Sequence, residues 1–283
     1  MIVALAQGFI ALAADTEGWV GTWLSEAEGV TNVTTLMPDG RFRTEHLAGI
    51  QVVGVTSGRW ELRSKAIRWS YDAPQSALPV DDVNPVVLKA PDRFVVRELS
   101  GSESSFFLKG TVDPKAPPDL PVAVGAGWVL KDELGEFAIR VTARETVGGR
   151  DCYRVDWIQG GRAYQSEYWF MDSEGIRVAG RRVLGVQAEF ATPYLLVKRV
   201  LTPGDEWDAS ITVRGREVRA TVSVGQRGEV VTAAGTFQAV PVTLQSDALH
   251  YVRWYTKDVG LVREDVLVGG QLHNTKTLQR RLE

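Results

Sequence analysis

The fold of this chain is decided by residues 137–170, which read FAIRVTARETVGGRDCYRVDWIQGGRAYQSEYWF. Apolar and polar residues alternate along three runs of this segment, and Gly148-Gly149 and Gly160-Gly161 separate the runs. A period of two places successive side chains on opposite faces of a strand, and paired glycines suit tight hairpin turns. The segment therefore predicts an antiparallel meander with one buried face.

The alternation also assigns residues to faces of the predicted strands. Further strands are expected over 218–224, 237–246, 249–256, 260–268 and 271–279. No stretch has a convincing helical period over three turns, and a short helix near 130–135 or 186–196 is left open as an alternative. The sets predicted to share a face are, run by run, Phe137, Ile139, Val141 and Ala143; Tyr153, Val155 and Trp157; and Tyr164, Tyr168 and Phe170.

The region before this meander has shorter strand-like runs, separated by turn signals such as Pro38-Asp39-Gly40 and Ser100-Gly101. Such spacing predicts a barrel or a sandwich. Between the two regions lies 112–123, VDPKAPPDLPVA, and proline cannot donate to a β-ladder. We therefore predict a first domain at 15–111, a proline-rich linker at 112–123 and a second domain at 124–283.

Composition excludes some classes of function. The chain has 283 residues and a net charge of -3, from 32 basic and 35 acidic side chains, and its basic residues cluster only in pairs. This predicts no binding to nucleic acid, which requires a concentrated basic surface. The single cysteine, Cys152, excludes an internal disulfide and is expected to be a buried structural thiol.

The first 14 residues, MIVALAQGFIALAA, are apolar and end in small residues, but lack a basic start. They predict a signal peptide and a periplasmic or secreted bacterial protein. The alternative is an N-terminal strand or helix that packs on the core. No later run approaches the ~18 apolar residues of a membrane-spanning helix, so no transmembrane segment is expected.

No catalytic, metal or cofactor motif is found. The histidines, His46, His250 and His273, are far apart, and the sequence has neither a Gly-x-Ser-x-Gly elbow nor a phosphate-binding loop. Asp205, Glu206 and Asp208 follow Pro203-Gly204 and are expected in an exposed turn. We therefore predict no enzyme and no cofactor. The enzymatic alternative requires folding to bring together His250, Asp205 and Glu206.

The N-terminal region contains a set of short aromatic and turn motifs: Gly21-Thr22-Trp23, Thr34-Thr35-Leu36, Pro38-Asp39-Gly40-Arg41-Phe42, Gly58-Arg59-Trp60-Glu61, Ile67-Arg68-Trp69 and Phe94-Val95-Val96-Arg97. In these motifs the region resembles a bacterial lipocalin-like domain. The resemblance implies a small antiparallel barrel, with the first Gly-x-Trp placing an indole across its floor.

The C-terminal region contains a second set of aromatic and glycine motifs: Tyr168-Trp169-Phe170, Gly175-Ile176, Leu201-Thr202-Pro203-Gly204-Asp205-Glu206-Trp207, Ala234-Gly235-Thr236-Phe237-Gln238-Ala239-Val240, Trp254-Tyr255 and Val259-Gly260-Leu261-Val262. In these motifs the region resembles exported bacterial domains that are similar to the periplasmic lipoprotein-carrier fold. That resemblance implies a larger curved antiparallel sheet, a half-barrel that wraps a hydrophobic cavity.

Together these features predict an all-β, non-catalytic envelope or secreted protein that binds a hydrophobic or lipid-like ligand. The residues expected to line the cavity are Tyr153, Val155, Trp157, Tyr168 and Phe170. The alternative is a scaffold with filled β cores that binds an envelope protein partner. The nine tryptophans fit either hypothesis, because aromatic side chains fill cores and also line ligand cavities.

Overall fold

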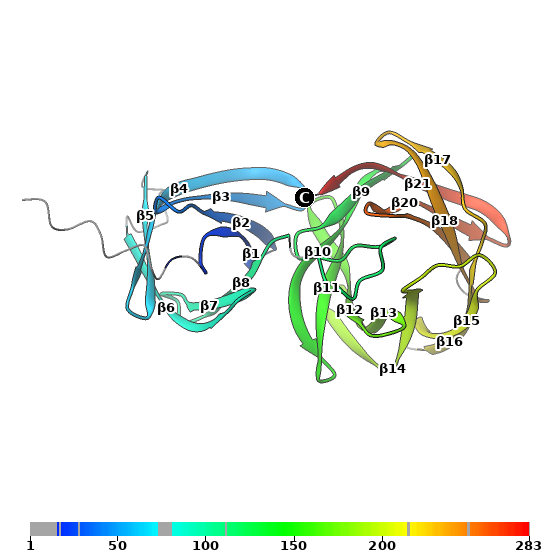
Figure 1. Cartoon of the computed structure of the whole chain (residues 1–283), viewed down its shortest axis with the longest axis horizontal. Helices are drawn as coiled ribbons and strands as arrows, with labels where there is room; N and C mark the ends of the chain where they lie inside the picture. The colour runs from blue at the N-terminus through cyan, green and yellow to red at the C-terminus, as the bar shows by residue number, and fades with distance from the viewer. Residues whose placement is uncertain are drawn as a thin grey trace, which may run out of the picture. The chain divides into compact units, whose positions relative to one another are not determined.

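The structure is a computed structural model that describes residues 16, 18–27, 29–72, 81–110, 112–213, 216–247 and 250–282. The predicted signal peptide at 1–14 lies outside these residues. The chain forms two compact units, Met1–Lys109 and Gly110–Glu283. All regular structure in the described residues is β, which confirms the predicted all-β class (Figure 1). The alternative of a short helix near 130–135 or 186–196 is wrong, because strands end at Asp132 and span Val186–Lys198. No described segment is a helix long and apolar enough to cross a membrane.

The first unit is a closed antiparallel barrel in which each strand pairs with the next. Its last strand returns to the first, with Trp23 opposite Leu108 and Leu24 opposite Phe107. The predicted small barrel is therefore confirmed, while the lipocalin-like resemblance stays a prediction. The strands are β1 (Gly21–Ala27), β2 (Val30–Leu36), β3 (Arg41–Ala48), β4 (Gln51–Arg63), β5 (Ala66–Tyr71), β6 (Asp81–Ala90), β7 (Arg93–Arg97) and β8 (Glu103–Leu108).

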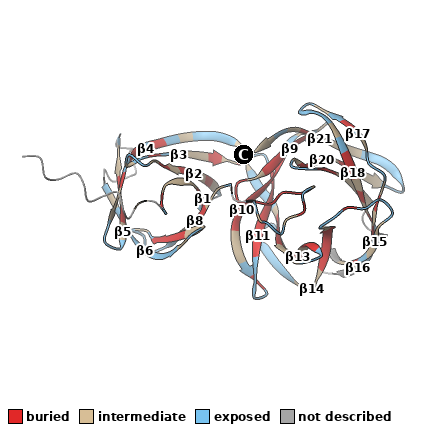
Figure 2. Ribbon diagram, viewed as in Figure 1, coloured by how far each residue is buried: buried red, intermediate tan, exposed pale blue. Residues whose placement is uncertain are grey.

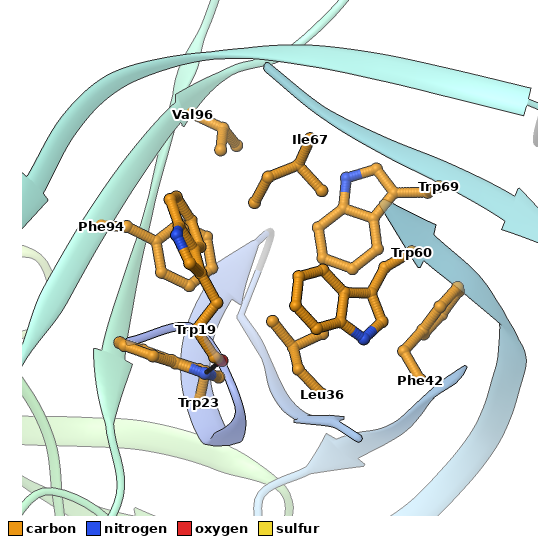
Figure 3. Close-up of a cluster of buried hydrophobic side chains, with 9 residues drawn as sticks. All are labelled: Trp19, Trp23, Leu36, Phe42, Trp60, Ile67, Trp69, Phe94 and Val96. Atoms are coloured by element: carbon orange, nitrogen blue, oxygen red, sulfur yellow. Dashed lines mark hydrogen bonds between the residues drawn. The ribbon is translucent and has the colours of Figure 1, made fainter. Parts of the chain in front are cut away.

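Apolar and aromatic side chains fill the interior of this barrel (Figure 3). The Phe94 ring lies 4.8 Å from that of Trp23 and 4.5 Å from that of Phe106, between centroids. The Trp23 indole Nε1 donates a 2.8 Å hydrogen bond to the backbone oxygen of Trp19. The buried cluster consists of Trp19, Trp23, Leu36, Phe42, Trp60, Ile67, Trp69, Phe94 and Val96.

The second unit is a 13-stranded antiparallel sheet that curves until its two edge strands face each other, as predicted for a larger curved sheet. Its strand order is β14-β13-β12-β11-β10-β9-β21-β20-β19-β18-β16-β15, and β17 pairs with β18 beside this path. The strands are β9 (Gly127–Asp132), β10 (Gly135–Val147), β11 (Arg150–Gln159), β12 (Arg162–Met171), β13 (Gly175–Val183), β14 (Val186–Lys198), β15 (Glu206–Val213), β16 (Arg216–Val224), β17 (Gly228–Thr232), β18 (Gly235–Gln245), β19 (His250–Thr256), β20 (Gly260–Val268) and β21 (Gln271–Leu282).

The proline-rich segment at 112–123 packs within the second unit. Leu120, Val122 and Ala123 are buried, and the Asp258 amide donates a 2.9 Å hydrogen bond to the Pro118 oxygen. Prolines suit this irregular path because they need no ladder donor yet still offer carbonyl acceptors. The segment therefore forms a cap on the sheet, and the unit boundary lies after Lys109.

Candidate functional site: interior and seam of the second unit

Three of the five predicted cavity residues share the inner face of the sheet. Tyr153, Val155 and Trp157 are buried on β11, a strand covered on both faces (Figure 2). The Trp157 ring lies 6.2 Å from the ring of Trp169, and the Tyr153 hydroxyl donates to Asp113 of the cap at 3.2 Å. Burial raises the pKa of Tyr153 to about 12.

The other two predicted residues, Tyr168 and Phe170, lie on the opposite face. The register of β11 and β12 pairs Tyr168 with Arg154 and Trp169 with Tyr153, and paired residues share a face. Tyr168 and Phe170 instead pack around Cys152 on the outer face, where Arg182 and Arg150 lie over their rings. The sequence pattern fixed which residues alternate in each strand, but not how adjacent strands are paired.

Two β-bulges change other predicted faces. The register shift between Val141 and Ala143 pairs Ala143 with Arg154, so Ala143 leaves the face of Val141. The shift between Trp157 and Ile158 leaves Tyr164 without a paired residue on β11. A bulge inserts one residue in a strand and reverses the facing of those beyond it, which a strict period of two cannot anticipate.

The inner face carries a buried carboxylate on one wall. Glu167 is 2% exposed and lies opposite Val155 in the register. It accepts hydrogen bonds from Trp169 Nε1 at 2.9 Å and from Arg181 Nη2 at 2.7 Å. A buried charge is tolerated when paired and hydrogen-bonded in this way.

The opposite wall carries a second buried carboxylate, Glu264 on β20. It accepts hydrogen bonds from Arg253 Nε of β19 and from Lys276 Nζ of β21, both at 2.8 Å. Burial alone would raise the pKa of Glu264, but the charges of Arg253 and Lys276 hold it at about 2. The carboxylate is therefore ionised in the folded protein at neutral pH.

Electrostatic interactions link the two walls across the interior. Burial raises the pKa of Tyr194 on β14 well above its ordinary value. The charge of Glu167 and the phenol of Tyr251, which lies on the far wall, raise this pKa further. Glu167 likewise contributes to the raised pKa of Tyr251 on β19. The interior is thus lined by paired charges and phenols, in contrast to the apolar core of the first unit.

Sequence reasoning missed this charged network. Tyr251, Arg253 and Tyr255 alternate with apolar residues, and such a mixed face is typical of a solvent-facing side of a strand. The available signal was cross-strand charge complementarity, because the register places Glu264 opposite Arg253 and Lys276.

The edge strands β14 and β15 meet at what we call the seam. The indole Nε1 of Trp207 on β15 donates a 3.0 Å hydrogen bond to the Leu195 oxygen of β14. A pocket of about 570 Å³ opens beside this bond. Its lining residues include Arg177, Tyr194, Leu195, Trp207, Asp208 and Arg219.

The seam pocket draws residues from both faces of the sheet. Trp207 and Ala209 pair with Val222 and Ala220 on the inner face, whereas Asp208 alternates to the outer face. Lys198 lies 5.1 Å from the centroid of the Trp207 ring. The pocket therefore reaches the inner aromatic face from outside and offers both apolar and charged groups.

Of the residues named for the enzymatic alternative, Asp205 pairs with Lys198 at 3.2 Å. Glu206 on β15 lies opposite Ser223 of β16, and His250 on β19 lies opposite Gln245 of β18. His46, in the first unit, contacts Asn32 at 2.7 Å and Thr56 at 3.1 Å. Among the described residues, no group of three or more His, Cys, Asp or Glu side chains is arranged to hold a metal ion.

Fold and site define an all-β protein with a filled small barrel and a larger sheet that opens at a seam. No family model matches the chain, and no curated protein matches it. It is similar in structure to a candidate lipoprotein of Parabacteroides distasonis, with 16% identity over 61% of this chain and 100% of the other, at a TM-score of 0.31. A candidate exported protein with a YmcC-like fold from Bacteroides fragilis has 14% identity over 59% and 98%, also at 0.31.

Proposed function

We propose that this protein is a non-catalytic binding protein of the bacterial envelope, whose second unit takes up a hydrophobic or lipid-like ligand. The observation that carries the proposal is the seam pocket between β14 and β15. It joins an aromatic inner face, with Tyr194 and Trp207, to the outside of the sheet. The apolar segment at 1–14 motivates the envelope location.

The pocket suits an amphiphile rather than a wholly apolar molecule. Trp207 and Leu195 offer apolar contact, and burial of a ligand methylene contributes about 0.8 kcal/mol. Arg219 on the same pocket is exposed, and no ion pair joins it to another described residue. A polar head group would bind there while the chain inserts along Trp207.

The proposal is tested by native mass spectrometry of the full chain purified from an exporting bacterial host, followed by solvent extraction. We expect a reproducible added mass that extracts as a lipid-like compound. In Trp207→Ala this mass should decrease severalfold. In Trp254→Ala, which alters an outer-face indole paired with Arg263, it should persist. If both variants carry the same amount of the added mass, the seam is not the ligand-binding site.

A second candidate function is binding of a protein partner through the first unit. Residues 51–56 of β4 pair with β3 on one side, whereas β5 pairs only with Gly58–Arg63. In the described part of the chain, no strand covers the other edge of 51–56, where Val52, Val53 and Val55 are exposed. Such an edge can add an extended strand of a partner.

This second candidate is tested by replacing Val53 with lysine, a residue that blocks strand addition at edges. Captured envelope proteins should be lost in Val53→Lys and retained in Val231→Lys, an exposed valine of β17. If both variants capture the same proteins, the β4 edge is not the docking site.

A further inference from the structure

The first unit carries a pocket of its own at one end of the barrel. The pocket has a volume of about 610 Å³, within the usual range for small-molecule sites. It lies between the turn that joins β4 to β5 and the end of β6. The residues used below are Trp19, Leu62, Lys65, Val86, Leu88 and Lys89, all of which line it.

A β-bulge points Lys89 into this end of the barrel. The register pairs Val86 with Val96 and Lys89 with Phe94, and shifts between Val86 and Leu88. Val96 and Phe94 belong to the buried core, so Val86 and Lys89 both face inward although they are three residues apart. Without the bulge, strict alternation would place them on opposite faces.

The ammonium group of Lys89 is held above the aromatic core. Its Nζ lies 5.0 Å from the Trp19 ring centroid and 5.1 Å from that of Trp23, and it donates to the Ala90 oxygen at 2.9 Å. Partial burial lowers the pKa of Lys89, while the nearby carboxylate of Asp92 acts to raise it. Lys89 is exposed at this end of the barrel, and its ammonium group has further donor capacity beside an apolar floor.

The lining of this pocket is cationic. Lys65, in the turn between β4 and β5, contributes a second ammonium group, and none of the described lining residues is acidic. Leu62 and Val86 pack against the core, and Leu88 is 38% exposed. The pocket thus combines two positive charges with an aromatic and aliphatic wall.

We propose that the open end of the first barrel is a second binding site, for an anionic amphiphile whose carboxylate or phosphate contacts Lys65 and Lys89 and whose aliphatic part lies on Trp19, Leu62 and Val86. This site is separate from the seam of the second unit. It gives a role to the inward-facing lysine that follows the bulge in β6.

Isothermal titration calorimetry on the full chain tests this site with four probes: decanoate, decyl phosphate, decanol and inorganic phosphate. We expect the two anionic amphiphiles to bind at least tenfold more tightly than the uncharged alcohol or the chain-free anion. Tighter binding of decanoate would identify a carboxylate ligand, and tighter binding of decyl phosphate a phosphate ester.

The lysines are tested by the double variant Lys65→Gln/Lys89→Gln, with Lys131→Gln, an exposed lysine of β9, as control. The double variant should weaken both anionic probes by about 100-fold, because each charge-assisted contact accounts for roughly a tenfold change. Lys65→Arg/Lys89→Arg should retain binding. Unchanged anion affinity in the glutamine variant, or equal binding of decanol, would overturn the proposal.

Binding at the seam is separated from this site by repeating the titrations in Trp207→Ala. If the lysine effect persists in that background, the barrel site is independent of the proposed function. If only Trp207→Ala weakens the anionic probes, the second site does not exist and the seam alone binds them.

Discussion

Gly260 illustrates how a single residue shapes the second unit. Its φ is +92°, and a Cβ there would lie 2.6 Å from Nε1 of the buried Trp128, which donates to the Val259 oxygen at 2.6 Å. We predict that Gly260→Ala lowers the free energy of unfolding by about 2–4 kcal/mol, through backbone strain and a clash with the indole. Urea unfolding measures the loss.

The matched control is Gly269→Ala. Gly269 also has a positive φ, +58°, but nothing lies within 4 Å of the added Cβ. Only backbone strain at positive φ applies here, so Gly269→Ala should lower the free energy of unfolding by about 1 kcal/mol. Equal losses in the two variants would show that contact with Trp128 is unimportant.

Glu264 provides a prediction about pH. Its pKa is held at about 2, below the 4.5 of a free side chain, so the folded state gains stability above the unfolded pKa. That stability, roughly 3 kcal/mol, should be lost as pH falls from about 4.5 towards 2. The free energies of unfolding of the parent and of Glu264→Gln should therefore converge as pH falls through this window. If the variant keeps the pH dependence of the parent, the low pKa does not belong to Glu264.

At the scale of secondary-structure elements, the seam joins the two ends of the strand order, where the Trp207 indole bonds to the Leu195 oxygen. We predict that Trp207→Phe keeps the ring but removes the hydrogen bond to Leu195. Loss of about 1 kcal/mol should speed amide hydrogen exchange in β15 by about fivefold. Hydrogen exchange with mass spectrometry measures this.

Trp60→Phe is the control for the seam. Its Nε1 also donates to a backbone oxygen, that of Met37 at 3.2 Å, but within a closed barrel. It should leave the exchange of β15 unchanged. Faster exchange in β15 of both variants would point to general destabilisation.

The same scale explains which part of the site could be predicted. The runs at 137–170 form β10, β11 and β12 as expected, and Tyr153, Val155 and Trp157 share one face. Tyr168 and Phe170 do not join them, because a one-residue change of register exchanges the two faces of a strand. Trp169 and Glu167 take their places.

For the whole molecule, the described strand pairings divide cleanly between the two units. We predict that residues 110–283 fold when produced alone, and that residues 124–283 are several kcal/mol less stable. The shorter piece lacks Leu120 and Val122, whose burial stabilises by about 1.5–3 kcal/mol each. Denaturant unfolding of the two pieces tests this, and equal stability would mean that 112–123 is only a linker.

The sequence by itself determined the β class and the meanders, because side-chain period and glycine turns act locally. For the first unit this pattern left a barrel or a sandwich open, and the small barrel was implied by the lipocalin-like resemblance. Tertiary structure alone decided the strand register, the bulges, the cap formed by 112–123 and the seam between β14 and β15. It also decided that Glu167 and Glu264 are buried with cations. These features depend on contacts between residues far apart in the chain, whose energies no local pattern records.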